Sequence, residues 1–166
     1  MYLGELTRHI LLDAAERKLL FGGHEEALRI LREREVFQTR HISEIEADEA
    51  GEYGACVKVL AEMGLGPVSS SYDCVLLKYI CQCVGIRAAV LAGAGVAALL
   101  NKMTRRNVTV GMDGSLYKFH PHFQSRMTVK IRDLVDKSKQ FQLFLSEDGS
   151  GKGAGLAAAV AASCWS

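Results

Sequence analysis

Proline is scarce in this chain, with 2 residues among 166, and no low-complexity stretch occurs, which argues against a disordered protein. An excess of charge of one sign is also missing, because 20 basic residues face 19 acidic ones and leave a net charge of +1. This balance gives no indication of binding to nucleic acid or to an anionic membrane. No apolar run in the sequence suggests a membrane span. Charged side chains within the first 16 residues interrupt any hydrophobic region of a secretory signal, so we expect none.

A disulfide framework is not indicated either. The number of cysteines is odd, and they lack the spacing of small disulfide-rich proteins: Cys56, Cys74, Cys81, Cys83 and Cys164. Such usage fits a reducing compartment, and we expect the protein to be cytoplasmic. The pair Cys81 and Cys83 lies on a predicted helix, where residues two apart point to different faces, so a metal site is disfavoured.

Hydrophobic periodicity predicts many helices followed by a mixed C-terminal third. We expect helices over residues 1–20, 25–35, 44–50, 53–63, about 71–103, 121–135 and 153–162, and strands over 107–112, 116–120 and 140–145. The order is typical of an α/β protein. Because few strands accompany so much helix, we expect the sheet to need further strands and the chain to be part of a larger unit.

Three features of these elements carry specific expectations. Strands 107–112 and 116–120 are predicted to form a hairpin around Asp113-Gly114. The small residues Gly93-Ala94-Gly95 in the long helix predict close packing against a neighbour. The last helix, 153–162, is so apolar that we expect it to be buried on most sides.

Two glycine-rich turns near the C-terminus are the strongest functional signal. Residues 108–115 (VTVGMDGS) and 146–153 (SEDGSGKG) each follow a predicted strand and combine an acidic residue, glycines and a serine. Turns of this kind expose backbone N–H groups to a bulky anion, and a helix following the second turn adds its own free N–H groups. Two such turns suggest a cradle for a nucleotide or sugar phosphate.

The alternatives to this interpretation are ordinary. Asp113-Gly114 fits a type I′ turn, and residues 146–153 fit a strand-to-helix loop. A P-loop does not match, since Ser146 and Gly153 stand where it needs glycine and a hydroxyl residue. A Rossmann fingerprint does not match either, since no G-x-G-x-x-G follows an early strand. His120-Pro121-His122 is expected to be structural or solvated, and the acidic run over residues 44–49 to be a solvated helical face.

Read together, several stretches resemble the hexokinase family, which includes glucokinase. They occur in family order over essentially the whole chain: YLGE (2–5), FQTRHISEIE (37–46), RAA (87–89), AGAGVA (92–97), VGMDGSLYKFHP (110–121) and SEDGSGKGA (146–154). The resemblance implies the actin-like ATPase (ribonuclease H-like) α/β fold. Residues 1–166 would then be a C-terminal fragment of the large domain, on its ATP-binding side, with a phosphate-loop hairpin at 107–121 and a glycine-rich turn and last helix at 146–162.

The same resemblance implies an activity and its ligands. Hexokinases transfer the γ-phosphoryl group of ATP, with Mg²⁺, to the 6-hydroxyl of glucose or a related hexose, the first step of glycolysis. The implied partners are therefore ATP, the hexose and the rest of the hexokinase chain. No nucleic acid and no membrane contact are expected of this segment.

Family site residues transfer to individual positions of this sequence. The resemblance implies nucleotide contacts by Met1, Thr39, Arg40, His41, Ile42, Ser43, Gly114, Ser115, Leu116, Tyr117, Lys118, Phe119 and Ser150. It implies glucose 6-phosphate contacts, in product-inhibited members, by Asp113, Gly114, Ser115 and Ser150. The small-residue helix around Gly93–Val96 matches the adenosine side.

The departures from the family pattern limit the activity expected of this chain. The chain matches about the last third of a catalytic unit, so the phosphate loop, the catalytic aspartate and the sugar-binding residues have no counterpart in it, and it is expected to be inactive alone. Gln38, His41 and Phe119 differ from the usual family residues, and the change at His41 is expected to bear on affinity. The alternative is a catalytically inactive nucleotide-binding or regulatory remnant.

Overall fold

The computed structural model describes residues 2–146 and 149–164, without the side chains of residues 149, 150 and 164. Helices come first and both strands lie in the last third, as the periodicity predicts. The elements are α1 (Tyr2–Glu16), the 3₁₀ turn η1 (Phe21–Gly23), α2 (Glu25–Arg32), α3 (Thr39–Ala47), α4 (Gly54–Glu62), the 3₁₀ turn η2 (Gly66–Val68), α5 (Ser71–Lys102), β1 (Asn107–Met112), α6 (Ser115–Phe119), α7 (Phe123–Leu134), β2 (Gln140–Leu145) and α8 (Gly149–Cys164).

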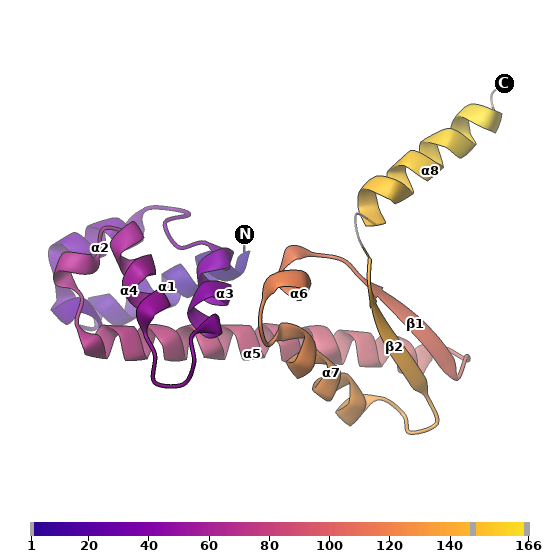
Figure 1. Cartoon of the computed structure of the whole chain (residues 1–166), viewed down its shortest axis with the longest axis horizontal. Helices are drawn as coiled ribbons and strands as arrows, with labels where there is room; N and C mark the ends of the chain where they lie inside the picture. The colour runs from indigo at the N-terminus through magenta and orange to yellow at the C-terminus, as the bar shows by residue number, and fades with distance from the viewer. Residues whose placement is uncertain (1, 147–148, 165–166) are drawn as a thin grey trace.

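The long helix α5 is the axis of the molecule. Its 32 residues span about 48 Å at 1.5 Å per residue. Helices α1 to α4 gather around its N-terminal half, while α6, α7 and the two strands lie along its C-terminal half (Figure 1). Each half has its own buried cluster, the first including Leu11, Ile42 and Leu77 and the second including Tyr117 and Met127. The fold therefore has two cores that share one helix.

Buried polar contacts fix the start of α5. Ser70 caps the helix, and the Asp73 carboxylate accepts hydrogen bonds from the Ser70 backbone N–H (2.7 Å) and from the Phe21 N–H (2.7 Å). One turn further on, the buried Lys78 ammonium donates to the carbonyls of Asp48, Glu49 and Glu52. These contacts tie η1 and the loop after α3 to the same helix, so α3 has a fixed position relative to α5.

Small residues bring α7 close to α5, as the sequence predicts. A Cβ atom placed on Gly93 would lie 2.9 Å from the Met127 carbonyl oxygen and 3.0 Å from Lys130 Cβ. Gly95, on another face of the same helix, has open space around it. Close packing against a neighbour is therefore confirmed for Gly93 and does not apply to Gly95.

The two strands pair in parallel, with Asn107 opposite Gln140 and Met112 opposite Leu145. Both strands have the predicted bounds, but the hairpin predicted for residues 107–121 is wrong. Residues 115–119 form helix α6, in which Tyr117 is buried and Phe119 exposed. The segment buries Tyr117 and His120, whose spacing of three residues is that of one helical face, and β1 pairs with β2 instead.

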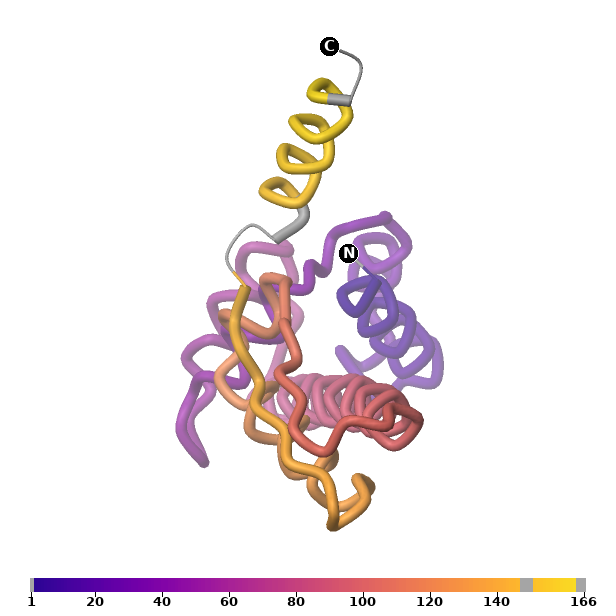
Figure 2. Tube along the Cα trace, turned by 90° about the vertical axis from the view of Figure 1, so that its right-hand side faces the viewer, coloured from indigo at the N-terminus to yellow at the C-terminus, as the bar shows by residue number. Residues whose placement is uncertain are grey.

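Helix α8 extends away from the rest of the molecule (Figures 1 and 2). Its residues 151–163 are all exposed, so the predicted burial of the last helix is wrong for this chain. The physical reason is that the described residues offer no surface against α8.

Helix α5 is long and apolar enough to cross a membrane by length and composition, contrary to the expectation from the sequence. Its position in both cores accounts for part of this composition, since α1, α3, α4 and α7 pack against it, while other large apolar side chains such as Tyr79 and Leu99 are exposed. The same test is passed by core helices of soluble proteins, and the lysine and aspartate buried along it are bound by protein groups. We interpret α5 as a core helix.

The two glycines of α5 give a matched test of this packing. Gly93→Ala is expected to lower the free energy of unfolding by about 1 to 3 kcal/mol, because the new methyl group displaces α7. Gly95→Ala is expected to raise it by roughly 0.5 to 1 kcal/mol, because an exposed helical glycine gains helix propensity. Urea unfolding of both variants measures the difference. Equal effects of the two substitutions would contradict the close approach of α7 at Gly93.

Candidate functional site

The first glycine-rich turn and Ser146, which begins the second glycine-rich segment, leave the sheet at the same edge, formed by the carboxyl ends of β1 and β2. Residues 149–153 of the second segment belong to the first turns of α8 and do not form the predicted loop. Because β1 and β2 are parallel and in register, Asp113 follows one strand where Ser146 follows the other. The Ser146 N–H donates a hydrogen bond of 2.8 Å to the Met112 carbonyl and continues the ladder by one residue. In open α/β sheets, ligands bind beyond the carboxyl ends of the strands, and this edge is therefore the expected place for a site.

Two pockets adjoin at this edge. The first, of about 450 Å³, lies between α3 and α6 and is lined by Thr39, Arg40, Ser43, Glu44, Ala47, Ser115, Leu116 and Phe119. The second, of about 380 Å³, lies at the strand ends and is lined by Asp113, Gly114, Ser115, Lys118, Phe119, Leu145 and Ser146. They share Ser115 and Phe119, so α6 separates an α3-side compartment from a strand-end compartment.

Helix α1 packs closely against the first turn of α3 and fixes its position. The Gly4 N–H donates to the Thr39 hydroxyl at 3.2 Å, and a Cβ on Gly4 would lie 2.7 Å from the Thr39 nitrogen. Arg40 extends from the same turn and contacts two carboxylates, Glu44 and Glu62, each at 3.1 Å. The α3 wall thus carries hydroxyl groups together with a cation that is already paired.

His41 lies behind this wall and points into the protein. Its Nδ1 accepts the Gln38 N–H at 3.0 Å, and its ring packs edge-on against Phe37. Burial lowers the pKa of His41 below its ordinary value, and the nearby Arg40 charge lowers it further, against the opposing effect of Glu44 and Glu62. His41 is therefore kept neutral to a lower pH than a free histidine.

The structure brings most of the predicted residues to the two pockets. Those lining them are Thr39, Arg40, Ser43, Asp113, Gly114, Ser115, Leu116, Lys118 and Phe119. Buried away from them are His41, Ile42 and Tyr117, whose nucleotide contacts stay a prediction. Met1 lies outside the described residues, and so does the side chain of Ser150.

Sequence reasoning missed two lining residues on α3, Glu44 and Ala47. Residues 39, 40, 43, 44 and 47 lie on one face of a helix. The sequence analysis predicts a helix that begins at residue 44, whereas α3 begins at Thr39. A helix predicted from Thr39 would have placed Glu44 and Ala47 on the same face as Thr39, Arg40 and Ser43. The acidic run was also misread, because Glu46 is buried and not solvated. The expectation that His120 is structural agrees with its full burial.

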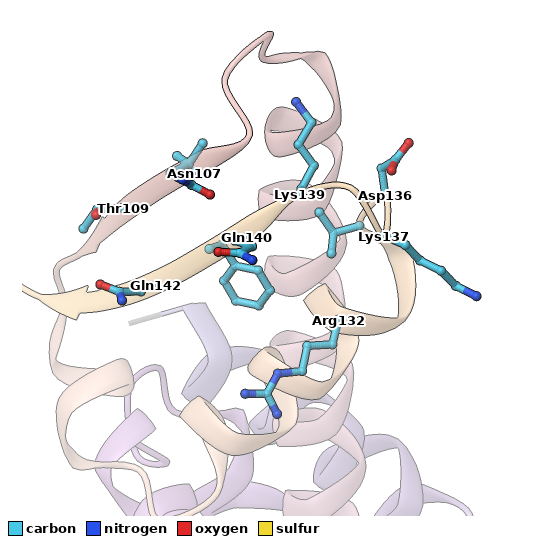
Figure 3. Close-up of a pocket in the computed structure, with 11 residues that line it drawn as sticks. Asn107, Thr109, Arg132, Asp136, Lys137, Lys139, Gln140 and Gln142 are labelled. Atoms are coloured by element: carbon cyan, nitrogen blue, oxygen red, sulfur yellow. The ribbon is translucent and has the colours of Figure 1, made fainter.

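A larger pocket, of about 760 Å³, lies at the opposite end of the strands. Figure 3 shows amide side chains of Asn107, Gln140 and Gln142 along the strands, with Arg132 and Lys137 on neighbouring segments. It opens at the start of the strands, where α/β sheets do not bind their ligands. We therefore place the candidate site at the other end.

The described residues hold no group of three His, Cys, Asp or Glu side chains that could bind a metal ion. Asp113 is a single carboxylate at the strand-end pocket. Mg²⁺ in phosphoryl-transfer sites is commonly held by one or two carboxylates together with the phosphates of the substrate. A metal held in this way needs few protein ligands, and Asp113 offers one carboxylate.

The family model described as Hexokinase matches residues 1–160. The chain belongs to the hexokinase family. It is 47% identical to the hexokinase of Schistosoma mansoni over 165 residues, which cover 99% of this chain and 35% of that protein. It is 42% identical to human hexokinase-1 over 166 residues, covering 96% of this chain and 17% of that protein.

A solved structure agrees with the sequence comparison. The structure of the Schistosoma mansoni hexokinase complexed with glucose matches with a TM-score of 0.88 at 46% identity, over 99% of this chain and 36% of that one. This match confirms the actin-like ATPase fold predicted from the sequence. It also shows that this hexokinase segment spans about a third of its relative.

The buried His41 predicts a pH dependence of stability. Because its pKa is lowered in the folded state, the unfolded chain takes up the proton first, and the contribution of His41 is lost as the pH falls below its ordinary value of about 6.5. His41→Gln is expected to flatten the fall of the unfolding free energy between about pH 7 and pH 5. Urea unfolding at several pH values checks this, with His24→Gln at an exposed histidine as the control. An unchanged slope in His41→Gln would contradict the assignment.

Proposed function

We propose that this chain forms the nucleotide-binding wall of a hexokinase, which transfers the γ-phosphoryl group of ATP to the 6-hydroxyl of glucose or a related hexose. The observation that carries the proposal is the pair of adjoining pockets where α3, α6 and the strand ends meet. Membership of the hexokinase family supports it, as does the related Schistosoma mansoni structure, which is a complex with glucose. A cytoplasmic, glycolytic role is part of the same proposal.

The α3-side pocket suits the adenosine end of ATP. Phe119 is 67% exposed although it is large and apolar, and it lines this pocket together with Leu116 and Ala47. Covering an exposed aromatic ring in a pocket with a flat base buries apolar surface, which makes binding of the base favourable. The hydroxyl groups of Thr39 and Ser43 on the facing wall offer hydrogen bonds to the sugar of the nucleotide.

The strand-end pocket suits the phosphates. Gly114 has φ 134° and ψ 145°, a conformation that side-chain-bearing residues rarely adopt, and open space surrounds the place of a Cβ. The backbone there is accessible to a phosphate, beside the hydroxyl groups of Ser115 and Ser146 and the Lys118 ammonium. These groups would position the triphosphate and stabilise its charge, which is what phosphoryl transfer requires of a protein.

Mg²⁺ would arrive with ATP and neutralise charge on its phosphates. Asp113, which lines the strand-end pocket, would orient the hydrated ion. In product-inhibited hexokinases the same positions are expected to hold the phosphate of glucose 6-phosphate, so Asp113 and Ser115, with Ser150, are proposed for that role as well. The catalytic base and the sugar contacts are expected from other parts of a hexokinase, and this chain alone is expected to bind ATP without phosphorylating glucose.

Two exposed phenylalanines give a matched test of ATP binding. Phe119 lines the α3-side pocket, whereas Phe144, 64% exposed on β2, lines neither pocket. Phe119→Ala is expected to raise the dissociation constant for ATP about ten-fold or more, because a stacked base loses about 1 to 3 kcal/mol without its aromatic partner. Isothermal titration calorimetry of the chain with ATP measures this constant.

Phe144→Ala is the control and is expected to leave ATP affinity unchanged. Equal affinities in the wild-type chain and in both variants would show that ATP does not bind against Phe119. No measurable binding of ATP to the folded wild-type chain would remove the nucleotide-wall proposal itself.

A further inference from the structure

The two walls of the α3-side pocket come from segments far apart in the sequence. Thr39 and Ser43 stand on α3, whereas Ser115 and Phe119 stand on α6. The width of the pocket therefore depends on whatever holds these two helices at a fixed separation. Directly behind the pocket, Glu46 lies one turn beyond Ser43 and His120 follows the last residue of α6.

Glu46 and His120 meet in the interior, with both side chains fully buried. His120 Nε2 lies 3.2 Å from Glu46 Oε1, and His120 Nδ1 accepts the His122 backbone N–H at 3.2 Å. Since Nδ1 acts as the acceptor, Nε2 carries the hydrogen and donates it to the carboxylate. A single buried hydrogen bond thus connects the end of α6 to α3.

Arg126 on α7 supplies the opposing charge. Its Nη1 lies 2.6 Å from Glu46 Oε2, and its side chain is 23% exposed. Neither atom meets the geometry of a hydrogen bond with any residue in the described part of the chain, so this contact is an ion pair. A buried carboxylate that lost such a partner would be an uncompensated charge, which is strongly unfavourable.

Gly85 on α5 provides the space for these three side chains. A Cβ atom at this position would lie 2.3 Å from Glu46 Oε1, 3.2 Å from His120 Nε2 and 3.3 Å from Arg126 Nη1. The cluster of Glu46, His120 and Arg126 therefore packs directly against the backbone of the central helix. Four elements meet at one carboxylate: α3, α5, α7 and the end of α6.

We propose that the Glu46–His120–Arg126 cluster is the positioning device that sets the separation of α3 and α6, and with it the affinity for ATP. The three are positioning residues, because they lie behind the pocket and line neither compartment. The inference rests on the proposed function, since it assigns to the cluster a role in nucleotide binding. Loss of one of these contacts would allow both α3 and α6, the two walls of the α3-side pocket, to move.

The test uses the 166-residue chain with Glu46→Gln, Arg126→Met, the double variant and the conservative Arg126→Lys. Titration calorimetry gives the dissociation constant for ATP, and amide hydrogen exchange reports the stability of α3 and α6. Each of the first two substitutions is expected to raise the dissociation constant about ten-fold and to speed exchange in residues 39–47 and 115–119, but not in α1 or α2. The double variant is expected to lose less than the product of the single losses.

Arg126→Lys keeps the charge and is expected to recover most of the affinity lost in Arg126→Met. Arg126 is partly exposed, so the two substitutions there keep the proposal testable if Glu46→Gln prevents folding. The matched control is the exposed pair of Asp13 on α1 and Arg17 just after its end, 2.9 Å apart. Asp13→Asn and Arg17→Met are expected to change neither ATP affinity nor exchange in α3 and α6.

Unchanged ATP affinity in folded Arg126→Met would overturn the proposal, as would failure of Arg126→Lys to recover affinity. Failure of the proposed function is a separate result. A wild-type chain that binds no ATP would remove the nucleotide role, while faster exchange confined to α3 and α6 would still show that the cluster joins the two walls. Exchange that rises evenly over the whole chain would make the cluster a general stabiliser and reject it as a positioning device.

Discussion

Parallel pairing of β1 with β2 is the constraint on which the rest of this structure depends. Parallel strands cannot be joined by a tight turn, so residues 113–139 must cross from the end of one strand to the start of the other. That crossover forms α6, which carries one wall of the pocket, and α7, which packs on α5 at Gly93. The same pairing brings Asp113 and Ser146 to one edge, so the site follows from the register of the two strands.

The site also requires the N-terminal helices to lie against the crossover between β1 and β2. Helix α5 belongs to both cores, and the site lies where α3 from the first core faces α6 from the second. The buried Glu46 carboxylate joins the two across Gly85. A polar cluster at such a junction specifies one relative arrangement of two cores, which apolar packing alone defines less sharply.

The sequence was informative where local pattern and environment agree. Strands 107–112 and 140–145 and the long helix capped by Ser70 have the expected places, because short apolar runs and the cap are local signals. Residues 116–120 were misassigned because their apolar spacing fits both a strand and a short helix. Glu46 was misread because its partners His120 and Arg126 are more than 70 residues away. Helix α8 was misread because apolar composition predicts burial, whereas no described residue covers it. The resemblance to hexokinases located the pocket residues, but it did not show that His41 faces inward.

The most direct test of the account is a chimera in which this chain replaces the matched third of the Schistosoma mansoni hexokinase, its 47% identical relative. The measurement is glucose-dependent formation of ADP from ATP, with glucose binding followed separately. We expect the chimera to phosphorylate glucose, and the Phe119→Ala form to show a raised KM for ATP with an unchanged KM for glucose. A folded chimera that binds glucose but forms no ADP would contradict the claim that this chain is a nucleotide-binding wall of a hexokinase.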